Sequence, residues 1–257
     1  MTPTQIIRHV NDGANFYVDF FADADHMSRI QTPHYTYTEP KPGEQGINFV
    51  YNIALENLPK DEQAAQINAI KALHMPAWWN LQCDDDLYKL IFGKEKSHAI
   101  AEPVDGDELY MALLPGELNA RRRLPKGIKI KKVVSAADFA HWAKFQNDVL
   151  CGGHQDIHPQ KHYRWCGNGK LRCFAAYCDN DIISVASIMR NDAACSLEFV
   201  ATHPDYRRQG LASAVCSETI LDAFESGAEI VTLRAINPGT RQLYCDTLGF
   251  TVYNFAL

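Results

Sequence analysis

The feature that most constrains the fold of this chain is a strand, a turn and a helix in direct succession at residues 196–224. The apolar run 196–202 leads into the turn HPDYRRQG at 203–210, after which small and apolar residues recur at helical spacing. A buried strand that feeds a helix through a short turn is the repeating step of α/β proteins. The stretch therefore predicts an α/β fold with this turn at the carboxyl end of a strand, where such folds tend to bind ligands.

The remainder of the C-terminal half repeats this alternation. Ser135 and Asp138 make a capping box ahead of a helix, and Asn237 followed by Pro is a favourable helix start. Gly249 is a typical helix stop. The predicted strands cover residues 128–134, 171–177, 182–189, 196–202, 230–233 and 250–255. The order β-α-β-β-β-α-β-α-β indicates a mixed central sheet flanked by helices.

The N-terminal half is patterned less clearly. It predicts strands at 47–53, 76–81 and 109–114 and helices at 60–73 and 86–91. The segment LPGELNARRRLPKG at 114–127 contains two prolines, two glycines and an arginine triplet, which is typical of a solvated linker, and the triplet is also able to bind an anion. We therefore place a domain boundary there, with an N-terminal α/β domain at 1–125 and a second domain at 126–257.

The turn before the helix at 211 has the chemistry of a phosphate cradle. The first N–H groups of a helix lack intrahelical partners and lie at the positive end of its dipole. Gly210 has no Cβ and lets the backbone approach an anion, while Arg207 and Arg208 supply positive charge. On the chemistry of these residues alone, the alternative is an arginine-rich helix start that faces solvent and binds no ligand.

Two motifs in order resemble the GNAT-type (GCN5-related) N-acetyltransferase superfamily. The sequence RRQGLA at 207–212 matches its motif A, [QR]-x-x-G-x-[GA], and NPGTRQLYCDTLGF at 237–250 is similar to its motif B. The resemblance covers residues 127–257 and implies the acyl-CoA N-acyltransferase fold, with acetyl-CoA as co-substrate. The N-terminal half lacks motif A, but residues 76–93 weakly resemble a degraded motif B. A tandem arrangement is thus expected, with a degenerate GNAT-like first domain.

The resemblance also assigns a cofactor site. It implies that loop amides hold the pyrophosphate, that the strand before the loop pairs with the pantetheine arm, and that this strand splays from the strand at 230–233. The cofactor-binding residues so implied are Val200, Ala201, Thr202, Arg207, Arg208, Gln209, Gly210, Leu211, Ala212, Ser213 and Asn237.

The catalytic residues implied by the resemblance are an acid and a base. Tyr244 matches the tyrosine that protonates the departing thiolate in this superfamily, although it could instead be a packed aromatic. Strand alternation places Ser196, Glu198 and Val200 on one face, with residues 197 and 199 on the other. Glu198 is the expected general base because burial raises the pKa of a carboxyl group, with Ser196 as a backup. Glu198 could alternatively make a structural salt bridge.

The expected function is transfer of an acetyl group from acetyl-CoA to a primary amine of a small molecule by direct attack. Two alternatives stay open at this point: a protein or peptide N-acetyltransferase, and a non-catalytic acyl-CoA-binding sensor. The superfamily fold usually adds a seventh strand beyond the one that follows motif B, whereas this sequence ends at residue 257, directly after the strand at 250–255. We expect the strand at 109–114, or a partner chain, to complete the sheet.

Composition excludes several other classes. The formal net charge of −6 argues against binding to nucleic acid or to an anionic membrane, and no apolar run approaches the ~18 residues of a membrane span. The N-terminus lacks the pattern of a signal peptide and the cysteines form no CxxC pair, so we expect a cytoplasmic protein with reduced thiols. His154, His158 and His162 have helical spacing, but Pro159 disfavours a shared helix, so no metal is expected. A homodimer remains open.

Overall fold

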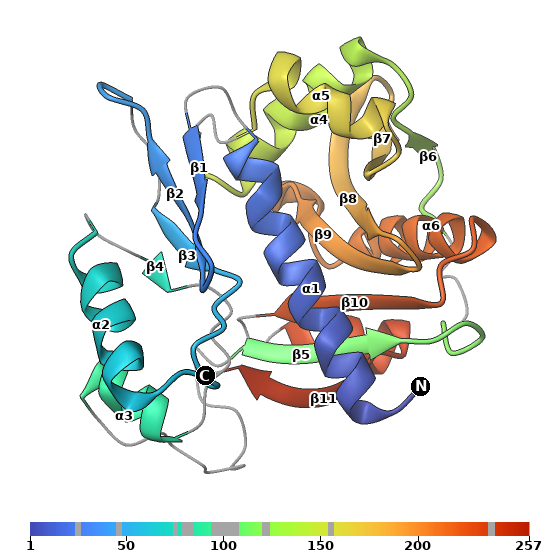
Figure 1. The fold of residues 1–257 in the computed structure, drawn as a ribbon. Helices are drawn as coiled ribbons and strands as arrows, with labels where there is room; N and C mark the ends of the chain where they lie inside the picture. The colour runs from blue at the N-terminus through green and yellow to red at the C-terminus, as the bar shows by residue number, and fades with distance from the viewer. Residues whose placement is uncertain are drawn as a thin grey trace. The chain divides into compact units, whose positions relative to one another are not determined.

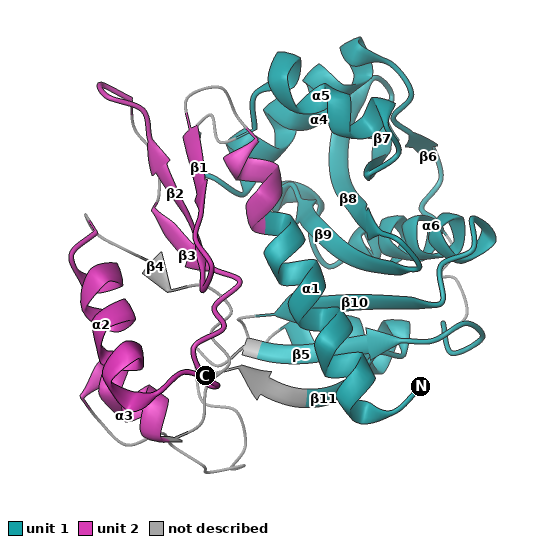
Figure 2. Cartoon of the chain, viewed as in Figure 1, with its two compact units in different colours: residues 1–17, 103–255 teal, residues 18–102, 256–257 magenta. Residues whose placement is uncertain are grey.

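The structure is a computed structural model that describes residues 1–23, 27–44, 48–73, 77–78, 85–93, 108–119, 124–153, 157–235 and 240–256. It divides into two compact units (Figure 2). Unit 1 comprises Met1–Tyr17 with Pro103–Phe255, and unit 2 comprises Val18–Glu102 with Ala256–Leu257. The sequence predicts one boundary after residue 125, whereas the compact units assign the first 17 residues and the segment after 103 to unit 1.

Unit 1 is built on a seven-stranded mixed sheet of order β11-β5-β10-β9-β8-β7-β6 (Figure 1). The strands are β5 (Glu108–Leu113), β6 (Ile128–Lys132), β7 (Leu171–Cys178), β8 (Asp181–Asn191), β9 (Ala194–Thr202), β10 (Ile230–Ala235) and β11 (Thr251–Ala256). The pairs β6–β7, β7–β8, β8–β9 and β5–β10 are antiparallel, and β9–β10 is parallel. This is the mixed α/β sheet that the sequence predicts.

The helical segments of unit 1 cover both faces of the sheet. They are α1 (Pro3–Ala22, of which residues 3–17 belong to unit 1), α4 (Ala136–Val149), α5 (Pro159–Gly167), the 3-10 turn η1 (Pro204–Tyr206), α6 (Leu211–Glu225) and the π-helical segment η3 (Gln242–Leu248). One face packs α6 and η3 into the main apolar core. The other face contacts α1, α4 and α5, with ring contacts from Tyr17 and Trp142 to Phe199 and from Phe16 to Trp165.

The predicted capping signals are present. Ser135 precedes α4 and its Oγ accepts a hydrogen bond from the N–H of Asp138 at 3.1 Å. Gly249 ends η3 with φ of +96°, and a Cβ built on it would lie 2.6 Å from the carbonyl oxygen of Glu117. Both the left-handed backbone and this close approach require glycine at position 249.

The strand predicted near 109–114 does complete the sheet. β5 pairs with β10 over five residues, Leu109–Ala235 to Leu113–Val231, and lies between β10 and β11. Leu109, Met111 and Leu113 are at most 1% exposed and belong to the main core. The strand after motif B is therefore the edge strand, and β5 is internal.

The first helix was not predicted. In α1, Ile6, Val10 and Ala14 are buried at a spacing of four residues, which is the stripe of an amphipathic helix. Ile6 packs with Ala112 and Ile230 on the sheet. The N-terminal residues thus contribute to the same sheet as the C-terminal half.

Among the residues that the structure describes, unit 2 contains a four-stranded sheet of order β1-β2-β3-β4, two helices of its own and residues 18–22 of α1. Its elements are β1 (Met27–Gln31), β2 (Thr36–Pro40), β3 (Phe49–Tyr51), α2 (Lys60–Lys71), β4 (Ala77–Trp78) and α3 (Asp85–Phe92). The predicted helices and β3 are present, while β1 and β2 were not predicted. That this unit is a degenerate relative of unit 1 stays a prediction.

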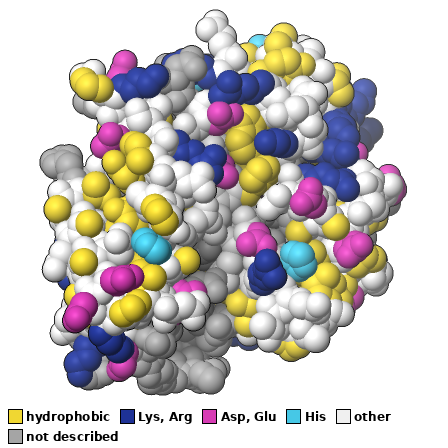
Figure 3. Space-filling view, viewed as in Figure 1, with side chains coloured by type: hydrophobic (Ala, Val, Ile, Leu, Met, Phe, Trp, Pro, Cys, Tyr) yellow, Lys and Arg dark blue, Asp and Glu magenta, His cyan; other side chains and the backbone are white. Residues whose placement is uncertain are grey.

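Lysines line β6, the strand at the edge of the large sheet opposite β11. On the edge strand β6, Lys129, Lys131 and Lys132 are exposed. Figure 3 shows Lys and Arg side chains gathered where Figure 1 places β6. Charged side chains on an edge strand disfavour pairing with another chain. Of the helices that the structure describes, none combines the length and apolarity needed to cross a bilayer.

An ion cluster joins this edge to α6 and yields a pH prediction. Asp222 accepts hydrogen bonds from Lys132 Nζ at 2.6 Å and Arg172 Nη1 at 2.9 Å. Burial alone would raise the pKa of Asp222, but the hydrogen bonds and charges of the two cations outweigh it and hold the pKa below its ordinary value. The folded state therefore favours the carboxylate, and its contribution to stability is lost as pH falls through that lowered pKa.

We expect Asp222→Asn to lower the melting temperature at pH 7 and to lose this effect progressively as pH falls below the unfolded pKa of about 3.9 and through the lowered folded-state pKa. Asp148→Asn, which breaks the exposed pair with Lys144, is the control and should change the melting temperature little. Thermal melts of both variants across this range check the result. An Asp222→Asn penalty that persisted undiminished at pH 3 would show a packing effect instead of an ionic one.

Candidate functional site

The predicted phosphate cradle forms a compact turn between β9 and α6. Tyr206 and Arg207 donate their N–H groups to the carbonyls of His203 and Pro204. Arg208 (φ +63°) and Gly210 (φ +78°) then take left-handed conformations on either side of Gln209. A non-glycine residue with positive φ is uncommon, and alternating conformations of this kind turn successive N–H groups toward one point.

The helix that follows leaves its first N–H groups available. Ala214 is the first residue whose N–H bonds back to the N-cap, reaching the carbonyl of Gly210 at 3.1 Å. The N–H groups of 210–213 precede that bond, and a helix N-terminus of this kind is suited to an anion. Leu211 and Ser213 are buried, which anchors this end against the core.

The polar side chains of the loop have distinct places. Arg207 Nε donates to the carbonyl of Thr202 at 3.1 Å, and Gln209 Nε2 donates to the carbonyl of Asp205 at 3.4 Å, so both brace the loop backbone. Ser213 Oγ donates to the carbonyl of Gly210 at 2.8 Å. Arg208 is exposed beside the helix start. Of the predicted loop residues, Arg208 is thus positioned to meet an anion with its side chain, and the others offer mainly backbone.

β9 and β10 separate just before this loop. They pair in parallel only at Ala194–Ile230, Cys195–Val231 and Ser196–Thr232. β9 continues to residue 202 and β10 to residue 235 without pairing to each other. The predicted splay between these strands is present, and it leaves one edge of β9 open to pair with an extended ligand.

A β-bulge lies where β9 and β10 separate after Ser196 and Thr232, a place that we call the fork. In the β8–β9 register Glu198 opposes Ser187 and Ala201 opposes Val185, so Phe199 and Val200 share one opposing residue. Phe199 has φ of +54°, and its carbonyl accepts a hydrogen bond from the amide Nε2 of the fully buried Gln146. The bulge therefore interrupts the regular pairing of β9 with β8 at the point where β9 and β10 separate.

The bulge overturns the predicted alternation along β9. Leu197 and Val200 both pack with the core on the α6 face, while Phe199 contacts Tyr17 and Trp142 on the opposite face. Ser196 also lies on that opposite face, against α1. Val200 therefore does not share a face with Ser196 as predicted, because one extra residue on the bulged strand reverses the order of faces.

The candidate base lies at the start of the open edge. Glu198 is half-buried, and its Oε1 accepts a hydrogen bond from Ser196 Oγ. Ser196 is 4% exposed and occupies the last paired position of β9 with β10. The structure thus joins the predicted base and its predicted backup in one hydrogen-bonded pair at the fork.

The candidate acid comes from the other face. Tyr244 in η3 is 9% exposed, belongs to the main core, and places its ring 6.1 Å from that of Phe250. Burial, followed by the nearby Cys216 and the Glu198 charge, raises the pKa of Tyr244 above its ordinary value. The phenol therefore stays protonated at neutral pH. The Glu198 charge is the last of these three causes, so Tyr244 and Glu198 interact electrostatically.

Several residues that the sequence singles out as site candidates lie outside the described ranges or away from this site. Asn237, His154 and the arginines at 121–123 lie outside the described residues. His158 is the N-cap of α5 and donates its N–H to Nδ1 of the buried His162 at 2.9 Å. Within the described ranges, no group of three or more His, Cys, Asp or Glu side chains is arranged to hold a metal ion.

Gln146 and α1 are the parts of this site that sequence reasoning missed. Gln146 gave no signal, because it acts 53 residues away on a backbone carbonyl. Gly13 of α1 meets the fork directly: a Cβ on it would lie 3.0 Å from Ser196 Cβ and 3.4 Å from Thr232 Oγ1. A glycine inside an apolar helical stripe was the available signal for such close packing.

Comparisons with known proteins agree with this geometry. The model of the acetyltransferase (GNAT) family matches residues 138–250. A search of curated proteins finds no match. A solved GCN5-related N-acetyltransferase from Kribbella flavida superposes with a TM-score of 0.63 at 14% identity, covering 96% of this chain and 93% of that chain.

A second solved structure, a GCN5-related N-acetyltransferase-like protein from Streptococcus suis, gives a TM-score of 0.51 at 14% identity over 96% of this chain and 97% of that chain. At this identity the structural similarity shows the fold. The match to the family model carries the assignment of residues 138–250.

Proposed function

Because residues 138–250 are a domain of the acetyltransferase (GNAT) family and the chain is an acyltransferase, we propose that it moves the acetyl group of acetyl-CoA to a primary amine of a small molecule by direct attack. The observation that carries the proposal is the fork between β9 and β10, which opens toward the anion-binding loop at 207–213. An extended chain that ends in a phosphate group fits an open strand edge followed by a helix N-terminus.

The residues present fit acetyl-CoA, which when bound supplies an activated thioester. The N–H groups of residues 208–213 would hold the pyrophosphate, with Arg208 adding charge. The open edge formed by Val200, Ala201 and Thr202 would pair with the pantetheine arm. Asn237 is also proposed to bind the cofactor.

The chemistry then belongs to three groups of the chain. The Glu198 carboxylate accepts the proton of the amine, and the Ser196 hydroxyl bonded to it holds the relay in place. The backbone N–H of Val200, released from regular pairing by the bulge, is a donor for a developing oxyanion. Tyr244 Oη holds the proton needed by the leaving group.

The protonation state of Tyr244 suits an acid, but its strength does not favour a large effect. Because burial raises its pKa, the phenol is protonated across the working pH range and gives up that proton reluctantly. General acids contribute most when their pKa lies near the working pH. We therefore assign the larger share of rate enhancement to Glu198.

The test is a thermal-shift titration with acetyl-CoA, CoA and desulfo-CoA, followed by thiol release against a panel of amines. A ligand at 100 times its Kd stabilises the folded state by about 2.7 kcal/mol. We expect stabilisation by all three compounds and amine-dependent release with acetyl-CoA. Stabilisation without release from any amine or peptide would favour the acyl-CoA sensor, and release only with peptides would favour a protein acetyltransferase.

Gly210→Val tests the cradle in the same assay. The side chain would add a β-branched residue at φ +78° and crowd the anion-binding turn, so we expect the acetyl-CoA-induced shift to be lost. Gly169→Val is the matched control, because Gly169 has φ of +75° with no atom within 4 Å of a Cβ. The control should lower the melting temperature similarly and keep the shift. Equal retention of the shift in both variants would contradict the assignment of the loop.

A further inference from the structure

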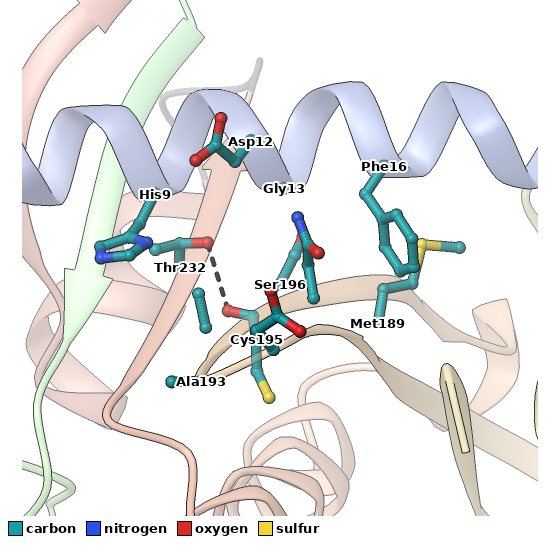
Figure 4. A pocket seen from close by; sticks show the side chains of 12 residues that line it. His9, Asp12, Gly13, Phe16, Met189, Ala193, Cys195, Ser196 and Thr232 are labelled. Atoms are coloured by element: carbon teal, nitrogen blue, oxygen red, sulfur yellow. Dashed lines mark hydrogen bonds between the residues drawn. The ribbon is translucent and has the colours of Figure 1, made fainter. Parts of the chain in front are cut away.

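Unit 1 contains a cavity of about 160 Å³ at the α1 side of the fork (Figure 4). Its walls come from α1, from the end of β8, from the β8–β9 turn and the first residues of β9, and from β10. Phe16 and Met189 supply apolar surface, and Ser196 and Thr232 supply buried hydroxyl groups. The α1 wall lies outside the residues, 138–250, that match the family model.

Gly13 brings the helix wall close to the strands. A Cβ at this position would come so near to Ser196 and Thr232 that the helix leaves no room for a side chain there. Figure 4 shows Gly13 of α1 facing these strands, with His9 and Phe16 on either side. α1 therefore closes the cavity over the last paired position of β9 and β10.

The cavity is next to the proposed chemistry. Ser196 lines it, and the Ser196 hydroxyl donates to the Glu198 carboxylate. Two residues along an extended strand span about 7 Å. A small ligand in the cavity would thus present one end to the Ser196–Glu198 pair while its remainder stays against α1.

The charge of the lining selects a cation. Two carboxylates line the cavity, the half-buried Asp12 and the exposed Asp192, beside one imidazole, that of His9, and the described lining residues include no Lys or Arg. Primary amines are cations at neutral pH, and carboxylates are their natural partners. An apolar cavity of about 150 Å³ accommodates benzene, so this volume suits a ligand of about six non-hydrogen atoms.

We propose that this cavity is the acceptor site and that it takes a small, cationic primary amine with a short apolar body. The proposal rests on the proposed acetyltransferase function. The ammonium group gives one proton through Ser196 to Glu198, and the nitrogen lone pair forms the N–C bond as the C–S bond breaks. Tyr244 gives its proton to the departing thiolate and is reprotonated by the second proton that the nitrogen loses, so the products are an amide and a free thiol. The proton held by Glu198 passes to solvent, so charge and atoms balance.

The two tight turns of β8 allow a matched design. Asp192 and Asp179 both have φ of +54° and both open a two-residue hairpin turn, but only Asp192 lines the cavity. Asn tolerates this conformation well, so Asp192→Asn and Asp179→Asn differ only in location. For volume, Ala193→Leu adds bulk to the lining, and Asn180→Leu makes the corresponding change at the other turn.

The probe is n-butylamine, with n-butanol as its uncharged counterpart, and binding to the full chain is followed by ligand-observed NMR with and without acetyl-CoA. We expect n-butylamine but not n-butanol to bind. Ala193→Leu should weaken binding and raise the KM for thiol release by about tenfold or more, as overpacking does. Asp192→Asn should weaken both by about threefold, and the two controls should change neither.

The outcomes separate this inference from the function itself. Thiol release with n-butylamine that is unaffected by Ala193→Leu would overturn the cavity as the acceptor site and leave the transferase intact. Absence of n-butylamine binding, or equal effects of Ala193→Leu and Asn180→Leu, would also overturn it. Failure of acetyl-CoA to bind would instead overturn the proposed function. In that case, loss of n-butylamine binding in Ala193→Leu would still support the cavity as an amine-binding site.

Discussion

Glu198→Gln should lower kcat by roughly 10²–10⁴-fold while the acetyl-CoA-induced thermal shift stays unchanged. The amide keeps the size of the side chain and can still bond to Ser196 Oγ, so the fork should keep its geometry. It cannot accept the proton of the attacking amine. Steady-state thiol release, measured across pH, checks the expectation.

Two further variants locate the effect. Glu225→Gln makes the same change at an exposed residue at the end of α6 and should leave kcat unchanged. Tyr244→Phe should cost less, about 10²-fold, because the raised pKa of Tyr244 makes it a weak acid. Should Glu198→Gln keep the wild-type rate, Glu198 would be a structural partner of Ser196 and not the base.

The parts of the site that the sequence predicts are those coded locally. The turn at 203–210 requires Gly210 at a left-handed position, and the capping pair Ser135–Asp138 is contained in four residues. Such signals depend on backbone geometry and on neighbours along the chain, so they can be read without a tertiary structure. The boundaries of β7, β8, β9 and α6 accordingly match within about two residues.

The bulge shows why the face of each residue could not be predicted as reliably. Phe199 is an ordinary strand residue in the sequence, and its left-handed backbone is held by the buried Gln146 of α4 and by aromatic contacts from α1 and α4. A period-of-two pattern assumes regular pairing and fails after one inserted residue. The candidate site therefore depends on contacts between elements far apart in the chain.

The cavity has the same origin. Its α1 wall comes from residues 9–16, and its strand wall from residues 189–196 and Thr232. The helical stripe of Ile6, Val10 and Ala14 was present in the sequence, but nothing in that stripe indicates which surface it covers. The turn at 203–210 could thus be predicted from the sequence, whereas the cavity proposed as the acceptor site could be seen only in the fold.

Deleting residues 1–120 should abolish folding of the remainder. The deletion removes β5 from between β10 and β11, together with the α1 residues that pack on Ala112, Ala194 and Ile230. It also removes Leu109, Met111 and Leu113, each buried in the main core. Burying such a side chain contributes about 1.5–3 kcal/mol, so these three alone approach the roughly 5–15 kcal/mol that stabilises a typical domain.

The fragment 121–257 is therefore expected to be insoluble or to lack a cooperative melting transition, although it contains the complete family match. A full-length companion, Met111→Ala, should lower the free energy of unfolding by about 2–5 kcal/mol and still fold. Circular dichroism melts and size-exclusion chromatography compare the two. A monodisperse fragment that binds acetyl-CoA would contradict the role of β5. Failure of the fragment would mean that residues 138–250, although they match the family model, do not fold without β5 and α1 from the N-terminal half.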